Sequence, residues 1–171
     1  MLGLLTPAVV GSLLLAILST AADYVWFLNI PQHQVTSGAI HGSTLFAALG
    51  LYIGWRKGKA GIGALGGLLS GLVAALSFYV LAPIGGYSMM LVSWLILWVM
   101  LAGLQTHLDG RLDIAKAIGR GIITAVVAAI GFGVILFELY RGWPPATFPA
   151  FKHFIAWSMA YLPGLYVLLK R

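Results

Sequence analysis

The side chains of this sequence that could do chemistry are few and stand in apolar surroundings. Five that could ligate a metal or carry a proton fall near one end of the predicted helices: Asp23, His33, His41, Glu138 and His153. Imidazole and carboxylate groups together suit zinc, iron or copper, so an outer-face metal- or haem-dependent enzyme or redox subunit is one hypothesis. The competing interpretation is structural: Asp23 pairs with His41, and the remaining histidines meet lipid headgroups. In that interpretation Glu138 pairs with Arg141 or Lys152.

No pattern in the sequence indicates a catalytic site. Ser43 lies two residues from His41, which places the two side chains on different faces of a helix. The sequence contains no phosphate-binding P-loop, no dinucleotide fingerprint and no HExxH zinc motif. It also has no cysteine, so cysteine nucleophiles, disulfides and thiolate metal sites are excluded. We therefore expect no catalytic residue and a non-enzymatic protein.

The composition indicates that the solvent around most of the chain is lipid. Of 171 residues, 61% are hydrophobic and 8% are charged, whereas a soluble domain carries about 25% charged residues. The formal net charge of +6 would suggest nucleic acid in a soluble protein. Here the basic residues lie between apolar segments, where they determine membrane topology instead. We expect an integral membrane protein with no nucleic-acid partner.

Spanning the hydrocarbon core of a bilayer takes about 20 mainly apolar residues. Six segments qualify, and Gly, Pro, Asn or Asp turn signals separate them. They comprise residues 4–28, 36–55, 61–81, 87–107, 114–140 and 149–169. Short connections predict that neighbours pack antiparallel and leave no room for a soluble domain. The predicted fold is all-α, a polytopic membrane protein with a single transmembrane domain over residues 1–171, built as a six-transmembrane-helix bundle.

The basic residues predict the orientation of this bundle. Eight of them fall on one side of a six-helix arrangement: Arg56, Lys57, Lys59, Arg111, Lys116, Arg120, Lys170 and Arg171. Only Arg141 and Lys152 fall on the other side. Because cytoplasmic loops carry the excess of Lys and Arg, the N- and C-termini are predicted to be cytoplasmic. We expect a multi-pass protein of a prokaryotic inner membrane.

Glycines recur along two of the predicted helices at a spacing that favours close helix packing. Gly63, Gly67 and Gly71 form one ridge on the third, and Gly50 and Gly54 end the second. Small residues four apart let helix backbones approach closely within a membrane. We interpret the ridges as packing inside one bundle in preference to a dimerisation face, although a homo-oligomer remains open.

The connection before the last predicted helix resembles the corresponding segment of the Insig (insulin-induced gene) family. The shared residues are Tyr140, Gly142, Thr147, Pro149, Phe151 and Trp157. The family's arrangement of six helices with both ends cytoplasmic is also similar. The chain departs from the family at residues 81–86, which lack the aspartate that follows the third helix, and it lacks the paired cysteines of animal members. The resemblance implies a bacterial- or archaeal-type homologue and leaves control of an animal sterol-sensing partner in doubt.

This resemblance implies a membrane-embedded sensor or scaffold whose cavity holds a sterol- or diacylglycerol-like lipid. The helix centres are apolar and carry neither the midplane charge nor the broken helix typical of a transporter. Aromatic, soft or hydroxyl-bearing residues are the predicted lining: Trp26, Ser77, Tyr79, Met90, Trp94 and Trp157. Ordinary packing is the competing interpretation for each. We expect no cofactor apart from a bound lipid, and partners that comprise membrane lipid, with other membrane proteins or a second copy left open.

Overall fold

A computed structural model describes residues 2–29, 34–110, 113–139 and 149–170 of the chain. Over these ranges the protein is all-helical, as the sequence predicts. Its elements are α1 Leu2–Asn29, α2 Gln34–Trp55, α3 Ala60–Gly85, the short 3-10 turn η1 Gly86–Ser88, α4 Met89–Leu108, α5 Ile114–Leu139 and α6 Ala150–Leu169. The helix predicted over 61–81 runs on to Gly85, through Pro83, and Gly86 at φ +62° ends it.

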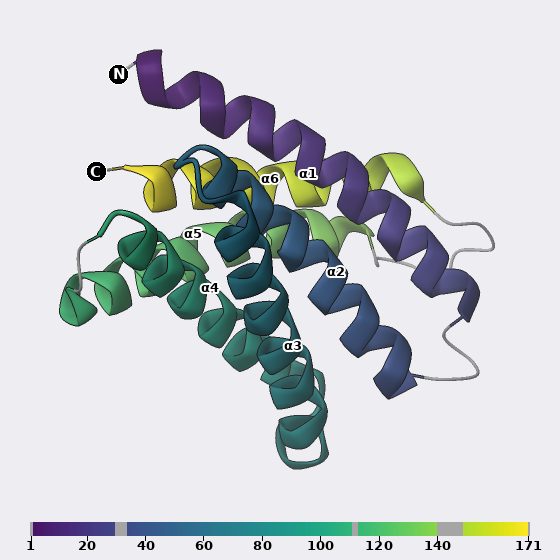
Figure 1. Cartoon of the computed structure of the whole chain (residues 1–171). Coiled ribbons are helices and arrows are strands. Elements are labelled where there is room, and N and C mark those ends of the chain that lie inside the picture. Colours follow the sequence, from purple (N-terminus) through teal and green to yellow (C-terminus); the bar gives the residue numbers. More distant parts are fainter. Residues whose placement is uncertain (1, 30–33, 111–112, 140–148, 171) are drawn as a thin grey trace.

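The helices form a closed ring in which each one packs on its neighbours in sequence. α6 completes the ring by packing against both α5 and α1, and α1 contacts α6 more extensively than it contacts α2. Both termini lie at the same end as the α2–α3 and α4–α5 connections (Figure 1). We call this the basic end, because Arg56, Lys57, Lys59 and Lys170 lie there.

The exterior of the ring is apolar, which is the reverse of a soluble fold. Large aliphatic side chains point outward on every helix, with Val80 at 70% and Ile84 at 83% exposure. Four helical segments are long and apolar enough to cross a membrane: Thr6–Val25, Ala60–Gly85, Met89–Leu108 and Ile114–Ile135. The chain is therefore a helical membrane protein. α2 and α6 do not meet that criterion, because both carry more polar side chains, His41 and His153 among them.

The glycine ridges join α2 to α3 within one chain, which confirms the packing interpretation. A Cβ built on Gly50 would lie 2.7 Å from the Cα of Gly67, and one built on Gly63 would lie 2.7 Å from the Cα of Gly54. Real side-chain atoms do not approach backbone so closely. Only glycine at these positions permits the observed contact between the two backbones.

Polar contacts fasten the basic end. Lys57, in the α2–α3 connection, forms an ion pair with Asp109 at the end of α4. Lys59 Nζ donates to the carbonyl oxygen of Leu108 at 3.0 Å. The α2–α3 connection is thus tied to the end of α4, beside Gly58 and Gly110, which follow α2 and α4 and have positive φ angles of 69° and 70°.

Candidate functional site

A polar cluster joins three helices at the end opposite the basic one. The carboxylate of Asp23, near the end of α1, lies 3.2 Å through Oδ1 from His41 Nε2 of α2. Its Oδ2 lies 2.8 Å from His153 Nδ1 and accepts a 2.6 Å hydrogen bond from Trp157 Nε1, both on α6. His153 and Trp157 are four residues apart, so they share one face of that helix. We call these four residues the Asp23 cluster.

The structure confirms the predicted pairing of Asp23 with His41 and corrects the expectation for His153. That histidine was assigned to lipid headgroups in the structural interpretation, but it is buried and bound to Asp23. The reason is that the first turns of α6 face α1, which the sequence alone did not indicate. His33 lies outside the described residues, as does the side chain of Glu138, and with it the pairing predicted for Glu138.

In the Asp23 cluster, two histidines share one carboxylate. Among the described residues, no group of three His, Asp or Glu side chains is arranged to hold a metal ion. His41 and His153 each direct one ring nitrogen at a different oxygen of the same carboxylate. Such contacts satisfy a buried charge, which is costly in a membrane without partners.

An aromatic array continues from the Asp23 cluster into the interior of the bundle. The Trp157 ring stacks on Tyr161, with centroids 5.3 Å apart, and lies 4.8 Å from Phe132 and 6.1 Å from Trp94. The hydroxyl of Tyr161 lies 2.9 Å from Ser19 Oγ of α1. These rings fill the space between α1, α4, α5 and α6.

The residues predicted to line a lipid cavity are distributed through the fold. Trp94 and Trp157 contact each other in the aromatic array, while the Ser77 hydroxyl lies 3.2 Å from that of Ser93. Tyr79 packs edge-on to Phe78 on α3, and Met90 is half-buried on α4. The side chain of Trp26 lies outside those described. The lipid-binding role of this set stays a prediction.

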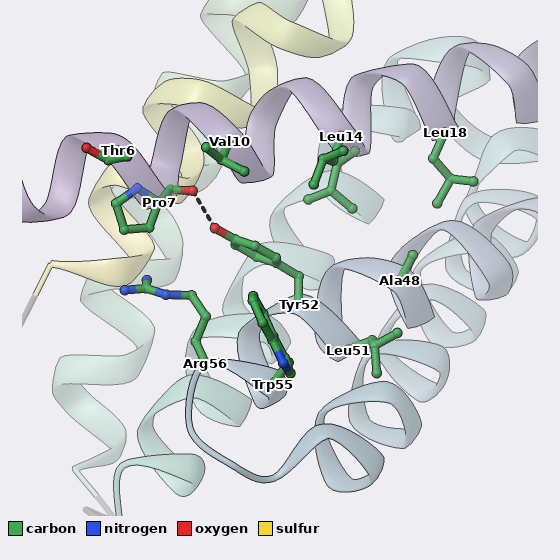
Figure 2. A pocket seen from close by; sticks show the side chains of 11 residues that line it. Thr6, Pro7, Val10, Leu14, Leu18, Ala48, Leu51, Tyr52, Trp55 and Arg56 are labelled. Carbon is green, nitrogen blue, oxygen red and sulfur yellow. Dashed lines mark hydrogen bonds between the residues drawn. The ribbon is translucent and has the colours of Figure 1, made fainter.

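A large groove lies elsewhere, between α1 and α2 toward the basic end (Figure 2). Its volume is about 850 Å³. The lining comprises Thr6, Pro7, Val10, Leu14, Leu15, Leu18, Ala48, Leu51, Tyr52, Trp55 and Arg56. None of the described residues from the predicted lining set is among them. Sequence reasoning missed the groove because it depends on how far α1 and α2 separate beyond their connection.

The groove is apolar along its length and polar at one end. Val10, Leu14 and Leu51 are about half exposed along its walls, so it is open along its side. The Tyr52 hydroxyl donates to the carbonyl oxygen of Pro7, and the Arg56 side chain lies at the same end of the groove as Pro7 (Figure 2). Gly11 leaves room for the Tyr52 ring, because a Cβ at this position would lie 2.6 Å from the ring.

Comparison with known proteins gives no match to any family model, curated protein or solved structure.

Proposed function

We propose that this chain is a non-enzymatic membrane protein that holds a neutral, sterol- or diacylglycerol-like lipid between α1 and α2. The α1–α2 groove carries the proposal. Its volume of about 850 Å³ lies within the range of about 300–1,000 Å³ typical of small-molecule sites, which are mostly apolar with a few placed polar groups. Here those polar groups are gathered at the Arg56 end, so a lipid would lie with its polar part there.

The chemistry of the groove favours an oxygen-bearing polar group on the lipid. Arg56 is exposed, and no described carboxylate forms an ion pair with it. A guanidinium group only donates hydrogen bonds, so it suits the hydroxyl and ester carbonyl oxygens of a diacylglycerol or the hydroxyl of a sterol. The apolar wall from Thr6 to Leu18 is about 18 Å long at 1.5 Å per residue, which accommodates an extended acyl chain.

The proposed topology has six spans, with both termini cytoplasmic and in a prokaryotic inner membrane. Support comes from the four long apolar helices and from α2 and α6, which run between the same two ends of the bundle (Figure 1). The segregation of eight basic residues to one side supports the orientation. Half of the Insig-like segment, residues 140–148, lies outside the described residues, and the segment supports the proposal through its sequence alone.

The test is native mass spectrometry of the detergent-purified protein, with lipid extraction and metal analysis of the same sample. Leu51→Trp places an indole in the groove, whereas Leu69→Trp is the matched control. The two leucines have almost equal exposure, 47% and 48%, and only Leu51 lines the groove. We expect one copurifying neutral lipid in the parent protein and in Leu69→Trp, and a strong loss in Leu51→Trp.

Three results would overturn the proposal. The first is the absence of any stoichiometric lipid, and the second is equal retention of lipid by both tryptophan variants. The third is a stoichiometric metal or haem that disappears when His41 or His153 is replaced by alanine, which would make the Asp23 cluster the functional centre.

A further inference from the structure

A second cavity lies at the basic end of the bundle, between α5 and α6. Its volume is about 370 Å³, and six residues line it: Lys116, Gly119, Arg120, Ile123, Val167 and Lys170. Three of the six are cationic and none is anionic. The α5 residues repeat at intervals of three or four, so they occupy one face of that helix. Lys170, directly after α6, faces them across the cavity.

No described carboxylate forms an ion pair with the cations of this cavity. Asp109 is engaged by Lys57, and Asp113 accepts a 3.0 Å hydrogen bond from the backbone N–H of Lys116, at the start of α5. No ion pair joins a described carboxylate to the side chain of Lys116, Arg120 or Lys170. The cavity therefore offers three positive charges to a ligand from outside the chain.

Gly119 shapes the cavity between two of its cations. A glycine inside a helix destabilises the helix by roughly 0.5–1 kcal/mol relative to alanine. Close packing against a neighbouring helix often explains why a glycine stands there. Gly121 has that explanation, since a Cβ there would lie 2.9 Å from Val99 Cγ2. Gly119 does not, because nothing lies within 4 Å of its Cβ position. Its missing side chain leaves the space between Lys116 and Arg120 open.

From these observations we infer that the cavity binds the phosphate headgroup of an anionic phospholipid. Lys116, Arg120 and Lys170 surround the phosphate, and Gly119 leaves room for it. Ile123 and Val167 form the apolar part of the lining, where the glycerol and first acyl carbons lie. Basic pockets between helices at the cytoplasmic membrane surface suit such headgroups, and this is the end proposed to be cytoplasmic. A lipid with two phosphates matches three cations better than one with a single charge.

The site is independent of the α1–α2 groove, and its test separates the two. The purified protein in neutral detergent is titrated with cardiolipin or with phosphatidylcholine, and bound lipid is counted by native mass spectrometry. Each cation near an anionic headgroup contributes about fivefold in affinity. Replacing Lys116, Arg120 and Lys170 together by glutamine should therefore weaken cardiolipin binding more than tenfold, with little change for phosphatidylcholine.

A charge-preserving variant distinguishes a shaped site from diffuse attraction. Gly119→Leu keeps all three cations and fills the cavity, while Gly133→Leu is its control. Gly133 is on the same helix, also has nothing within 4 Å of its Cβ position, and lies outside the cavity. Cardiolipin binding weakened by Gly119→Leu, unchanged by Gly133→Leu and retained in Leu51→Trp supports the site.

Three outcomes would overturn it. Equal cardiolipin binding by the two leucine variants would reduce the cavity to general surface charge. Equal binding of cardiolipin and phosphatidylcholine would remove the role of the cations. Complete displacement of cardiolipin by millimolar inorganic phosphate would identify the ligand as a free phosphate in place of a lipid headgroup.

Discussion

The carboxylate of Asp23 holds three helices at once, and replacing it by leucine removes all three contacts. Hydrogen bonds between helices in a membrane contribute about 0.6 kcal/mol on average and at most about 1.7 kcal/mol. The three contacts of Asp23, to His41, His153 and Trp157, therefore sum to about 2–5 kcal/mol. We expect Asp23→Leu to lower the free energy of unfolding by that amount.

Asp23→Asn separates geometry from charge in the same cluster. Its single carbonyl oxygen can take the place of Oδ2 and accept from both His153 and Trp157, while its NH₂ group faces a ring nitrogen of His41 that accepts in one tautomer. The shape of the side chain is retained, and only the contribution of its charge to the hydrogen bonds is lost. The free energy of unfolding should therefore fall by less than half as much as in Asp23→Leu.

The assay is reversible unfolding of the detergent-solubilised protein by increasing SDS fraction, followed by tryptophan fluorescence. Thr20→Ala is the control: it removes a polar group from α1 near the same depth, but Thr20 Oγ1 donates within its own helix, to the carbonyl oxygen of Ala16 at 2.8 Å. Thr20→Ala should lower the free energy of unfolding by about 0.6 kcal/mol or less, which is the average contribution of one hydrogen bond between helices in a membrane. If Asp23→Leu were no less stable than Thr20→Ala, the cluster would not hold α1 to α6. Equal losses in the leucine and asparagine variants would show that charge alone matters.

Three further predictions concern packing and the basic end. Gly50→Val should cost about 1–3 kcal/mol by overpacking, measured by the same SDS titration, whereas Gly61→Val, which faces open space, should unfold like the parent. Gly11→Val should displace the Tyr52 ring and lower neutral-lipid retention at little loss of stability, so unchanged retention would argue against the α1–α2 groove. Asp109→Ala should cost less than about 1 kcal/mol, as partly exposed ion pairs do, and this small loss should shrink further in 0.5 M salt; a larger loss would show that the ion pair is essential to the hairpin contact.

The helices and the contact between α2 and α3 were predictable from the sequence. Apolar length determines a membrane helix almost alone, and the spacing of Gly63 and Gly67 indicates a helix face able to approach a partner closely. The partner could be inferred because α2 and α3 are joined by a short connection. The extension of α3 to Gly85 was missed, since Pro83 and the following glycines were interpreted as a break.

The candidate sites were predictable only where neighbours in sequence meet. Asp23 and His41 flank one connection, so their similar depth predicted their contact. His153 and Trp157 share a helix face by their spacing, yet nothing local indicates that this face meets α1. Trp94 and Trp157 contact each other in the aromatic array, and this pairing of α4 with α6 is likewise not indicated by any local pattern. The groove depends on the angle between two helices, which no residue pattern specifies.

The closure of the ring by α1 and α6 has a consequence for synthesis. Asp23 and His153 are separated by 130 residues, and chains grow at about 5–20 residues per second, so about 6.5–26 s pass before the histidine follows the aspartate out of the ribosome. During that interval His41 is the only one of the three partners of Asp23 in the cluster that has been made. A charged group at the edge of the bilayer must wait for its other two partners. The nascent protein should therefore be most exposed to membrane quality control just before α6 is made, and truncation ahead of α6 should mark it for degradation.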